Sequence, residues 1–171
     1  MSFFSKLRLT VEKKKTRVFL SFFFAILSRM HQTFVACVTK KLDEFFGGIA
    51  ISPDGFLIAL GTSIRQPYKV MLLSCTDFAV VAELLGHTNY INCVAFARLG
   101  SMLASGSFDS TVRLWNIKNL QDIECFATIN NEEPVHHMAV TSDGRLLAVN
   151  CERDVRLTTI DGRATRRLTG H

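Results

Sequence analysis

Four side chains with the chemistry of a hydrolytic triad lie close together in the middle of the sequence: His87, Ser105, Asp109 and Trp115. A histidine placed between a serine and an aspartate can activate the serine hydroxyl as a nucleophile. That chemistry also needs an exposed serine, usually on a strained G-x-S-x-G elbow, and an oxyanion hole. No G-x-S-x-G occurs in the sequence. We therefore predict a structural role for these residues and no enzymatic activity.

The same four side chains can satisfy one another as hydrogen-bonding groups. Ser105 and Trp115 lie in strand-like runs on either side of a turn that contains Asp109, and His87 comes just before the first strand-like run. An indole N–H can only donate and a carboxylate can only accept, whereas an imidazole does both. A buried set of this kind holds its strands together, because an unpaired member costs about 1–3 kcal/mol.

The elements that must position these residues belong to a repeat slightly more than 40 residues long. Its turn glycines are Gly55, Gly100 and Gly144, which are 45 and 44 residues apart. Each copy reads as four short alternating strands separated by Gly, Asp and Ser turns, which is typical of an antiparallel meander. One four-stranded sheet of this size cannot bury both of its faces, but sheets stacked radially can, and that arrangement is a β-propeller.

The repeat resembles that of the WD-repeat (tryptophan–aspartate repeat) β-propellers. The resemblance is carried by Gly86-His87 at the start of the middle copy, by "SFDSTVRLWN" at its end and by the repeat length, over residues 46–171. The aspartate that follows the tryptophan in this family is Asn116 here. The resemblance implies an all-β fold, a partial propeller of about three four-stranded antiparallel blades. It also implies that His87, Ser105, Asp109 and Trp115 form a buried hydrogen-bond relay.

The relay residues are missing from the two flanking copies. At the serine and tryptophan positions the first copy has Leu60 and Leu73, and the third has Val149 and Thr158. Asp154 keeps the place of the turn aspartate in the third copy. We therefore expect these two blades to be held together mainly by apolar packing.

We divide the chain into an N-terminal arm and a propeller segment. The predicted boundaries are 1–41 for the arm, 42–171 for the propeller segment, and about 46–85, 86–129 and 130–169 for its blades. Gly170-His171 resembles the start of a further repeat. Three blades do not close a ring, so we expect a fragment of a longer protein, or a protomer that completes its ring by self-association.

The arm holds most of the positive charge. Residues 1–41 contain nine of the 20 Lys and Arg residues and one acid, while 42–171 hold eleven basic and fourteen acidic residues. Three alternatives stay open for the apolar segment 18–30: a docking helix with a Phe-rich face, a secretory signal peptide, and a membrane-surface anchor. The segment 33–41 can also be read as the outer strand of a preceding blade. Nucleic-acid binding is expected only through this basic arm.

The cysteines and histidines give no sign of a metal or cofactor site. The five cysteines are far apart and form no C-x-x-C, which argues against a disulfide framework or a zinc site. His136 and His137 are neighbours on a predicted strand, so they point to opposite faces and cannot chelate one ion. The free thiols favour a reducing compartment, the cytoplasm or nucleus, over the membrane-associated or secretory alternative.

The function that these features favour is a non-catalytic scaffold for other proteins. The resemblance implies contacts through the loops before each first strand and between the second and third strands. The candidate residues are Arg65, Asn89, Tyr90, Phe108, Glu132, Glu133 and Arg153. The alternatives are a membrane-tethered or exported protein directed by its arm, with membrane contact through residues 18–30, and the regulatory propeller of a larger enzyme.

Overall fold

The computed structural model describes residues 9–14, 17–27, 33–42, 46–63, 66–151, 154–161 and 165–168. The chain forms two compact units, Met1–Phe45 and Phe46–His171. Arg65, Arg153 and the dipeptide Gly170-His171 are outside the described residues.

The N-terminal unit is a three-stranded antiparallel meander, and the helix that we considered for its apolar segment is wrong. The strands are β1 (Leu9–Lys14), β2 (Arg17–Leu27) and β3 (Thr33–Leu42), in the order β1-β2-β3. The sequence of β2 is rich in phenylalanine, and aromatic residues favour strands. A run of this kind cannot be assigned to helix or strand by its periodicity alone. The strand expected over 33–41 is confirmed.

No helix in the described part of the chain is long and apolar enough to cross a membrane.

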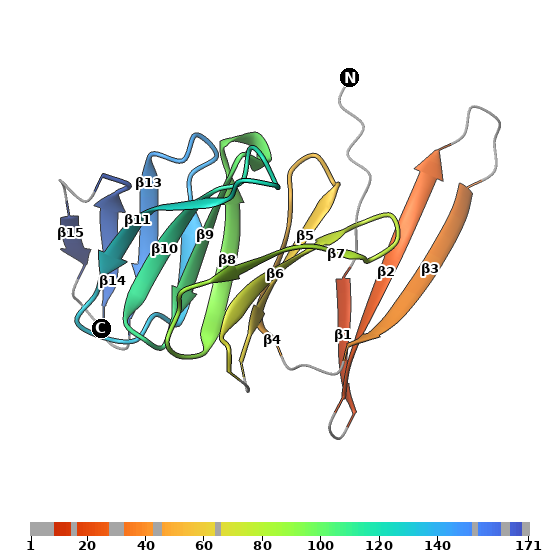
Figure 1. Cartoon of the computed structure of the whole chain (residues 1–171), viewed down its shortest axis with the longest axis horizontal. Coiled ribbons are helices and arrows are strands. Elements are labelled where there is room, and N and C mark those ends of the chain that lie inside the picture. The colour runs from red at the N-terminus through yellow and green to blue at the C-terminus, as the bar shows by residue number, and fades with distance from the viewer. Residues whose placement is uncertain are drawn as a thin grey trace. The chain divides into compact units, whose positions relative to one another are not determined.

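The second unit contains three four-stranded antiparallel sheets, each built from consecutive strands (Figure 1). Blade 1 consists of β4 (Phe46–Ile51), β5 (Leu57–Thr62), β6 (Lys69–Ser74) and β7 (Val80–Leu85). Blade 2 consists of β8 (Ile91–Ala97), β9 (Met102–Ser107), β10 (Thr111–Asn116) and β11 (Glu124–Asn130). Blade 3 consists of β12 (His137–Val140), β13 (Leu146–Asn150), β14 (Val155–Thr159) and β15 (Thr165–Leu168). The predicted fold class, an all-β partial propeller, is confirmed.

Blade 2 packs between its two neighbours through separate apolar cores. The core shared with blade 1 includes Leu72, Leu84, Leu103 and Trp115. Gly48 brings the backbones of β4 and β8 together, because a Cβ atom at this position would lie 2.7 Å from the Cα of Cys93. Each fully buried leucine contributes about 1.5–3 kcal/mol to folding, so these contacts stabilise the blade stack.

The core between blades 2 and 3 is also apolar, and one side-chain hydrogen bond joins the two blades beside it. Leu114, Leu147 and Val149 are fully buried in it. The Asn92 side-chain amide donates a hydrogen bond to the Val135 carbonyl, with a distance of 2.8 Å. Blade 3 is therefore fixed to blade 2 at the loop that precedes β12.

Blade 3 also contains ion pairs that we did not expect from its sequence. Asp154, 7% exposed, accepts hydrogen bonds from the guanidinium of Arg167 in β15. Arg156 in β14 donates to Glu132 in the preceding loop, at 2.7 Å. The expectation of mainly apolar packing is therefore incomplete for blade 3, and blade 1 also contains an ion pair, between Lys69 in β6 and Glu83 in β7 at 2.8 Å.

Candidate functional site

The loops that carry the predicted site residues gather at one end of the blades. They precede β8 and β12, and they connect β5 to β6, β9 to β10 and β13 to β14. Backbone hydrogen bonds link these loops. The Phe108 amide donates to the Tyr90 carbonyl at 2.8 Å, and the Val135 amide donates to the Ser107 carbonyl at 3.0 Å. We call this end the loop face.

The four triad-like residues form one connected set of hydrogen bonds below the loop face. The Trp115 indole donates to Ser105 Oγ at 2.9 Å, and Ser105 Oγ lies 2.8 Å from His87 Nε2. The other ring nitrogen, His87 Nδ1, lies 2.8 Å from Asp109 Oδ2. The set thus joins β10, β9, the loop before β8 and the β9–β10 turn.

The direction of each hydrogen bond follows from the chemistry of the groups. Because the Asp109 carboxylate can only accept, His87 Nδ1 must carry the proton, and Nε2 then accepts from the Ser105 hydroxyl. Burial lowers the pKa of His87 below its ordinary value of 6.5, although the hydrogen bond to Asp109 and the charge of Asp109 oppose this. The imidazole is therefore neutral near pH 7, and its contact with Asp109 is a hydrogen bond and not an ion pair.

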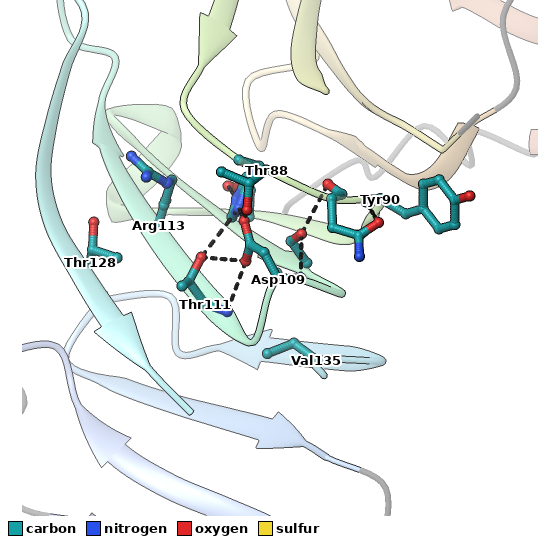
Figure 2. Close-up of polar contacts among 12 residues, drawn as sticks. Thr88, Tyr90, Asp109, Thr111, Arg113, Thr128 and Val135 are labelled. Atoms are coloured by element: carbon teal, nitrogen blue, oxygen red, sulfur yellow. Dashed lines mark hydrogen bonds and ion pairs between the residues drawn. The ribbon is translucent and has the colours of Figure 1, made fainter. Parts of the chain in front are cut away.

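Asp109 organises the turn around it (Figure 2). Its Oδ2 accepts from the Thr88 amide at 2.9 Å, and its Oδ1 accepts from the Thr111 amide at 2.9 Å and the Thr111 hydroxyl at 2.6 Å. Burial acts to raise the pKa of Asp109, but the hydrogen bonds from Thr111, Thr88 and His87 outweigh it, so the pKa is lowered. The carboxylate is charged at neutral pH and holds the β9–β10 turn against the loop before β8.

This geometry does not fit a nucleophilic triad. Ser105 has no exposed surface, and its oxygen is already held by Trp115 and His87. A substrate carbonyl has no access to that oxygen, and attack would break two buried hydrogen bonds. The arrangement stabilises blade 2 and sets the position of the loops above it.

A row of aromatic rings runs across the loop face from blade 1 to blade 3. The centroid of Tyr68 lies 5.4 Å from that of Tyr90, Tyr90 lies 6.2 Å from Phe108, and Phe108 lies 5.2 Å from His136. All three contacts are edge-to-face, the geometry that aromatic pairs favour. Tyr90 is 41% exposed and Phe108 is 38% exposed, so the row presents apolar surface to solvent. We call these four residues the aromatic row.

The backbone beneath the aromatic row is held by local hydrogen bonds. Asn89 Oδ1 accepts from the Tyr90 amide at 2.8 Å, and the Asn89 carbonyl accepts from the Ser107 hydroxyl at 3.0 Å. Figure 2 shows the Tyr90 ring directed away from the Asp109 network. The relay and these turns thus support a preformed surface.

The structure brings only some of the predicted contact residues together. Tyr90 and Phe108 belong to the aromatic row, and Asn89 shapes the loop below it. Glu132 is engaged in the ion pairs of blade 3, and Glu133 has one buried carboxylate oxygen with no hydrogen-bond partner among the described residues. Arg65 and Arg153 lie outside the described residues, so their role stays a prediction.

Sequence reasoning missed Tyr68 and His136 as members of the row. His136 comes directly before β12, as Tyr90 comes directly before β8, so the repeat register could have paired them. Tyr68 directly precedes β6, in a connection longer than its counterpart in blade 2, and no alignment of the copies points to it.

Among the described residues, no group of three or more His, Cys, Asp or Glu side chains could hold a metal ion. Cys93 is buried in the core, and burial raises the pKa of its thiol to about 12. That cysteine behaves as an apolar core residue.

Comparison with known proteins connects this fold and relay to a family. Residues 78–116, from the β6–β7 turn to the end of β10, match the family model described as WD domain, G-beta repeat. The β-propeller domain of Cps50 (Swd1) from Myceliophteria thermophila superposes with a TM-score of 0.62 at 21% identity, over 72% of this chain and 38% of that one. The latter comparison shows the β-propeller fold.

Two curated relatives match longer stretches of sequence. The chain is 28% identical over 121 residues to the periodic tryptophan protein 2 homolog of Schizosaccharomyces pombe, which is 70% of this chain and 13% of the relative. It is 33% identical over 111 residues to the probable cytosolic iron-sulfur protein assembly protein 1 of Kluyveromyces lactis, which is 59% of this chain and 32% of the relative. The chain therefore spans less than a third of the length of either relative.

The fold is that of a β-propeller segment, and residues 78–116 match the WD repeat, whose fold is in general a non-enzymatic scaffold. The matches together support a WD-repeat family, with its subfamily unspecified.

Proposed function

We propose that this chain is a non-catalytic scaffold that binds other proteins through its loop face. The observation that carries the proposal is the aromatic row, which crosses all three blades and stays partly exposed at Tyr90 and Phe108. Tyrosine and phenylalanine are enriched at protein interfaces, where they supply a large contact area. They also lose little side-chain entropy on binding.

The rigidity of the row supports this proposal. Each ring packs against its neighbour, and the hydrogen bonds of Asn89, Ser107 and Asp109 hold the loops below. A preformed surface loses less conformational freedom on binding than a mobile one, which favours affinity.

We further propose that the propeller segment forms part of a larger propeller. In blade 3, Leu147 packs on blade 2, and the alternation of strand residues directs Leu146 to the opposite face, where it is 47% exposed. Leu168, 44% exposed, pairs with Val155 on that same outer face. Exposed leucines on a sheet face suit contact with a further blade, or with a second copy when no further blade is present.

We place the protein inside the cell, in the cytoplasm or nucleus. The name of one relative includes cytosolic iron-sulfur protein assembly, and another relative, from Xenopus tropicalis, is an intraflagellar transport protein 122 homolog. These names support an intracellular location and give no support to the membrane-associated or secretory alternatives.

The proposal can be tested by comparing two sets of captured proteins. The full chain and its Tyr90→Ser/Phe108→Ser variant are used as affinity baits, and captured proteins are quantified by mass spectrometry. Phe56→Ser is the matched control, because Phe56 is 66% exposed in the β4–β5 turn, away from the loop face. We expect a defined set of proteins to be lost with the double variant and kept with the control. If both variants capture the same proteins as the unaltered chain, the loop face is not the binding surface.

A further inference from the structure

A small cavity opens at the end of blade 2 opposite the loop face. Its volume is about 310 Å³, and the described residues that line it are Ser101, Met102, Asn116, Lys118 and Phe126. Met102 begins β9 and Asn116 ends β10, and these two residues are paired in the sheet. The cavity therefore lies at the far end of these strands from the Asp109 turn.

Two of the described lining residues are apolar. Met102 is 1% exposed and Phe126 is 41% exposed. In β11, Phe126 falls at a bulge, because Leu114 pairs with Ala127 and Trp115 pairs with Cys125. The bulge leaves Phe126 without a partner in the register, and its exposed side chain lines the cavity.

Besides the Ser101 hydroxyl, the side chains of Asn116 and Lys118 supply hydrogen-bond donors among the cavity residues. The Asn116 side-chain oxygen accepts from the Lys118 backbone amide at 3.3 Å, which leaves the NH₂ group of Asn116 as a donor. No ion pair joins the Lys118 ammonium to a carboxylate within the described residues, and none of the described cavity residues is acidic. Glu124, which pairs with Asn116 in the β10–β11 register, is exposed and is not one of them.

The identity of residue 116 decides the charge of this site. The WD repeat takes its name from an aspartate at this position, which would place a carboxylate beside Lys118 and neutralise it. Asparagine keeps the oxygen that caps the Lys118 amide but removes the negative charge. The result is a partly apolar cavity with a cation and an amide donor and without an acid among its described lining.

We propose that this cavity binds the C-terminal residue of a partner protein whose last side chain is apolar. The side chain would pack on Met102 and Phe126, and the terminal carboxylate would accept hydrogen bonds from Lys118 and Asn116. The charges are complementary, and charge-assisted hydrogen bonds are about twice as strong as neutral ones. A cavity of about 310 Å³ is at the small end of the range of ligand pockets. A cavity of this size therefore suits a single residue that carries both the apolar side chain and the terminal carboxylate.

The test uses fluorescence anisotropy with the full chain and a defined probe. The probe is a fluorescein-labelled peptide of glycine and serine that ends in leucine with a free carboxylate, and its C-terminal amide is the comparison peptide. We expect amidation to weaken binding by about tenfold, the effect of losing one charge-assisted hydrogen bond. If neither peptide binds, or if both bind equally well, the proposal is wrong.

Variants of the cavity residues give a second, independent measurement. Asn116→Asp and Lys118→Gln are each expected to weaken binding of the acid peptide severalfold and to leave binding of the amide peptide unchanged. Lys118→Arg is expected to retain binding. Arg145→Gln is the matched charge control, because Arg145 is 85% exposed in the β12–β13 turn of blade 3. Wild-type affinity in both Asn116→Asp and Lys118→Gln, with unchanged thermal melts, would overturn the proposal.

The outcome does not depend on the loop face. Tyr90→Ser should bind the probe as the unaltered chain does, because Tyr90 lies at the other end of blade 2. Loss of probe binding in Tyr90→Ser alone would assign the peptide to the loop face and contradict the cavity proposal.

Discussion

Trp115 Nε1 lies 2.9 Å from Ser105 Oγ, and both side chains are buried, Ser105 completely. This contact assigns the serine to structure, because a fully buried hydroxyl that accepts from an indole and donates to His87 is not accessible to a substrate. The contact also joins two neighbouring strands, β9 and β10, through their side chains as well as their backbones. The stability of blade 2 should therefore depend on this single oxygen atom.

Replacing Ser105 by alanine should lower the free energy of unfolding by about 1–2 kcal/mol, because the Trp115 N–H and His87 Nε2 would be left unpaired in a dry environment. Urea unfolding followed by circular dichroism measures the change. Ser142→Ala is the matched control, since Ser142 is exposed in the β12–β13 turn. Equal unfolding midpoints for the two variants would show that the hydrogen bond contributes nothing.

Stability should fall on acidification because of His87. Burial lowers the pKa of His87 below 6.5 in the folded chain, so the unfolded chain binds the proton more readily. The stability that neutral His87 contributes is then fully present above pH 6.5 and declines as the pH drops below that value. The lowered pKa of Asp109 acts in the same direction at lower pH, since its stabilising effect is lost as the carboxylate is protonated.

Urea midpoints at pH 5 and pH 7.5 measure this dependence. His87→Gln should be less stable than the unaltered chain at pH 7.5 and should show a smaller loss between the two pH values. His137→Gln, a change at an exposed residue of β12, should keep the full loss. The same pH dependence in His87→Gln and in the unaltered chain would remove His87 as its source.

Because β4 and β8 approach closely at Gly48, replacing this glycine by alanine should destabilise the chain. A Cβ atom would lie 2.7 Å from the Cα of Cys93, and backbone cannot move aside as a flexible side chain can. We expect Gly48→Ala to lower stability by at least about 1–3 kcal/mol, the usual cost of overpacking. Thermal melts of the variant and the unaltered chain measure the difference.

Gly55→Ala is an informative comparison for that experiment. No atom lies within 4 Å of a Cβ atom at Gly55, but its φ is +77°, so alanine there is strained without a clash. The cost should be about 1–2 kcal/mol. A Gly48 variant as stable as the unaltered chain would show that blades 1 and 2 do not pack as closely as described.

The outer face of blade 3 should cause self-association of the chain. Sedimentation of the full chain should show oligomers, and Leu146→Glu/Leu168→Glu should reduce their fraction, because the charges oppose burial of that face. Phe56→Glu is the control for added charge at an exposed apolar residue. A compact monomer with a sharp melt would contradict the expectation that this face is covered by another blade or copy.

The basic arm should account for binding to anionic surfaces. Lys13, Lys14 and Lys15 follow one another in a segment that holds a single acid among its first 41 residues. Changing all three to glutamine should shorten retention on heparin and reduce the slope of log affinity against log salt, because fewer counterions are released. An unchanged salt slope would place the anion-binding charges elsewhere in the chain.

The amino-acid sequence by itself determined the repeat, the strand class of its members and the relay. His87, Ser105, Asp109 and Trp115 could be recognised because their donors and acceptors match and because they lie within one copy of the repeat at the places that the resemblance to WD repeats implies. These are local properties: a meander brings neighbouring strands together in chain order, so the hydrogen-bonded residues, which are 10, 18 and 22 positions apart, meet without help from distant segments. The same reasoning failed for β2, where an apolar run suits either a helix or a strand and only pairing with β3 decides between them.

The tertiary structure alone decided which residues from different blades meet. The contact of Tyr68 with Tyr90 and that of Phe108 with His136 join successive blades, and no repeat periodicity specifies the packing angle that brings those rings together. The cavity beside Asn116 likewise forms where Phe126 of β11 and residues at the ends of β9 and β10 line the same space. Surfaces formed between repeats arise from how the sheets stack, and stacking is set by the sum of many side-chain contacts, not by any one motif.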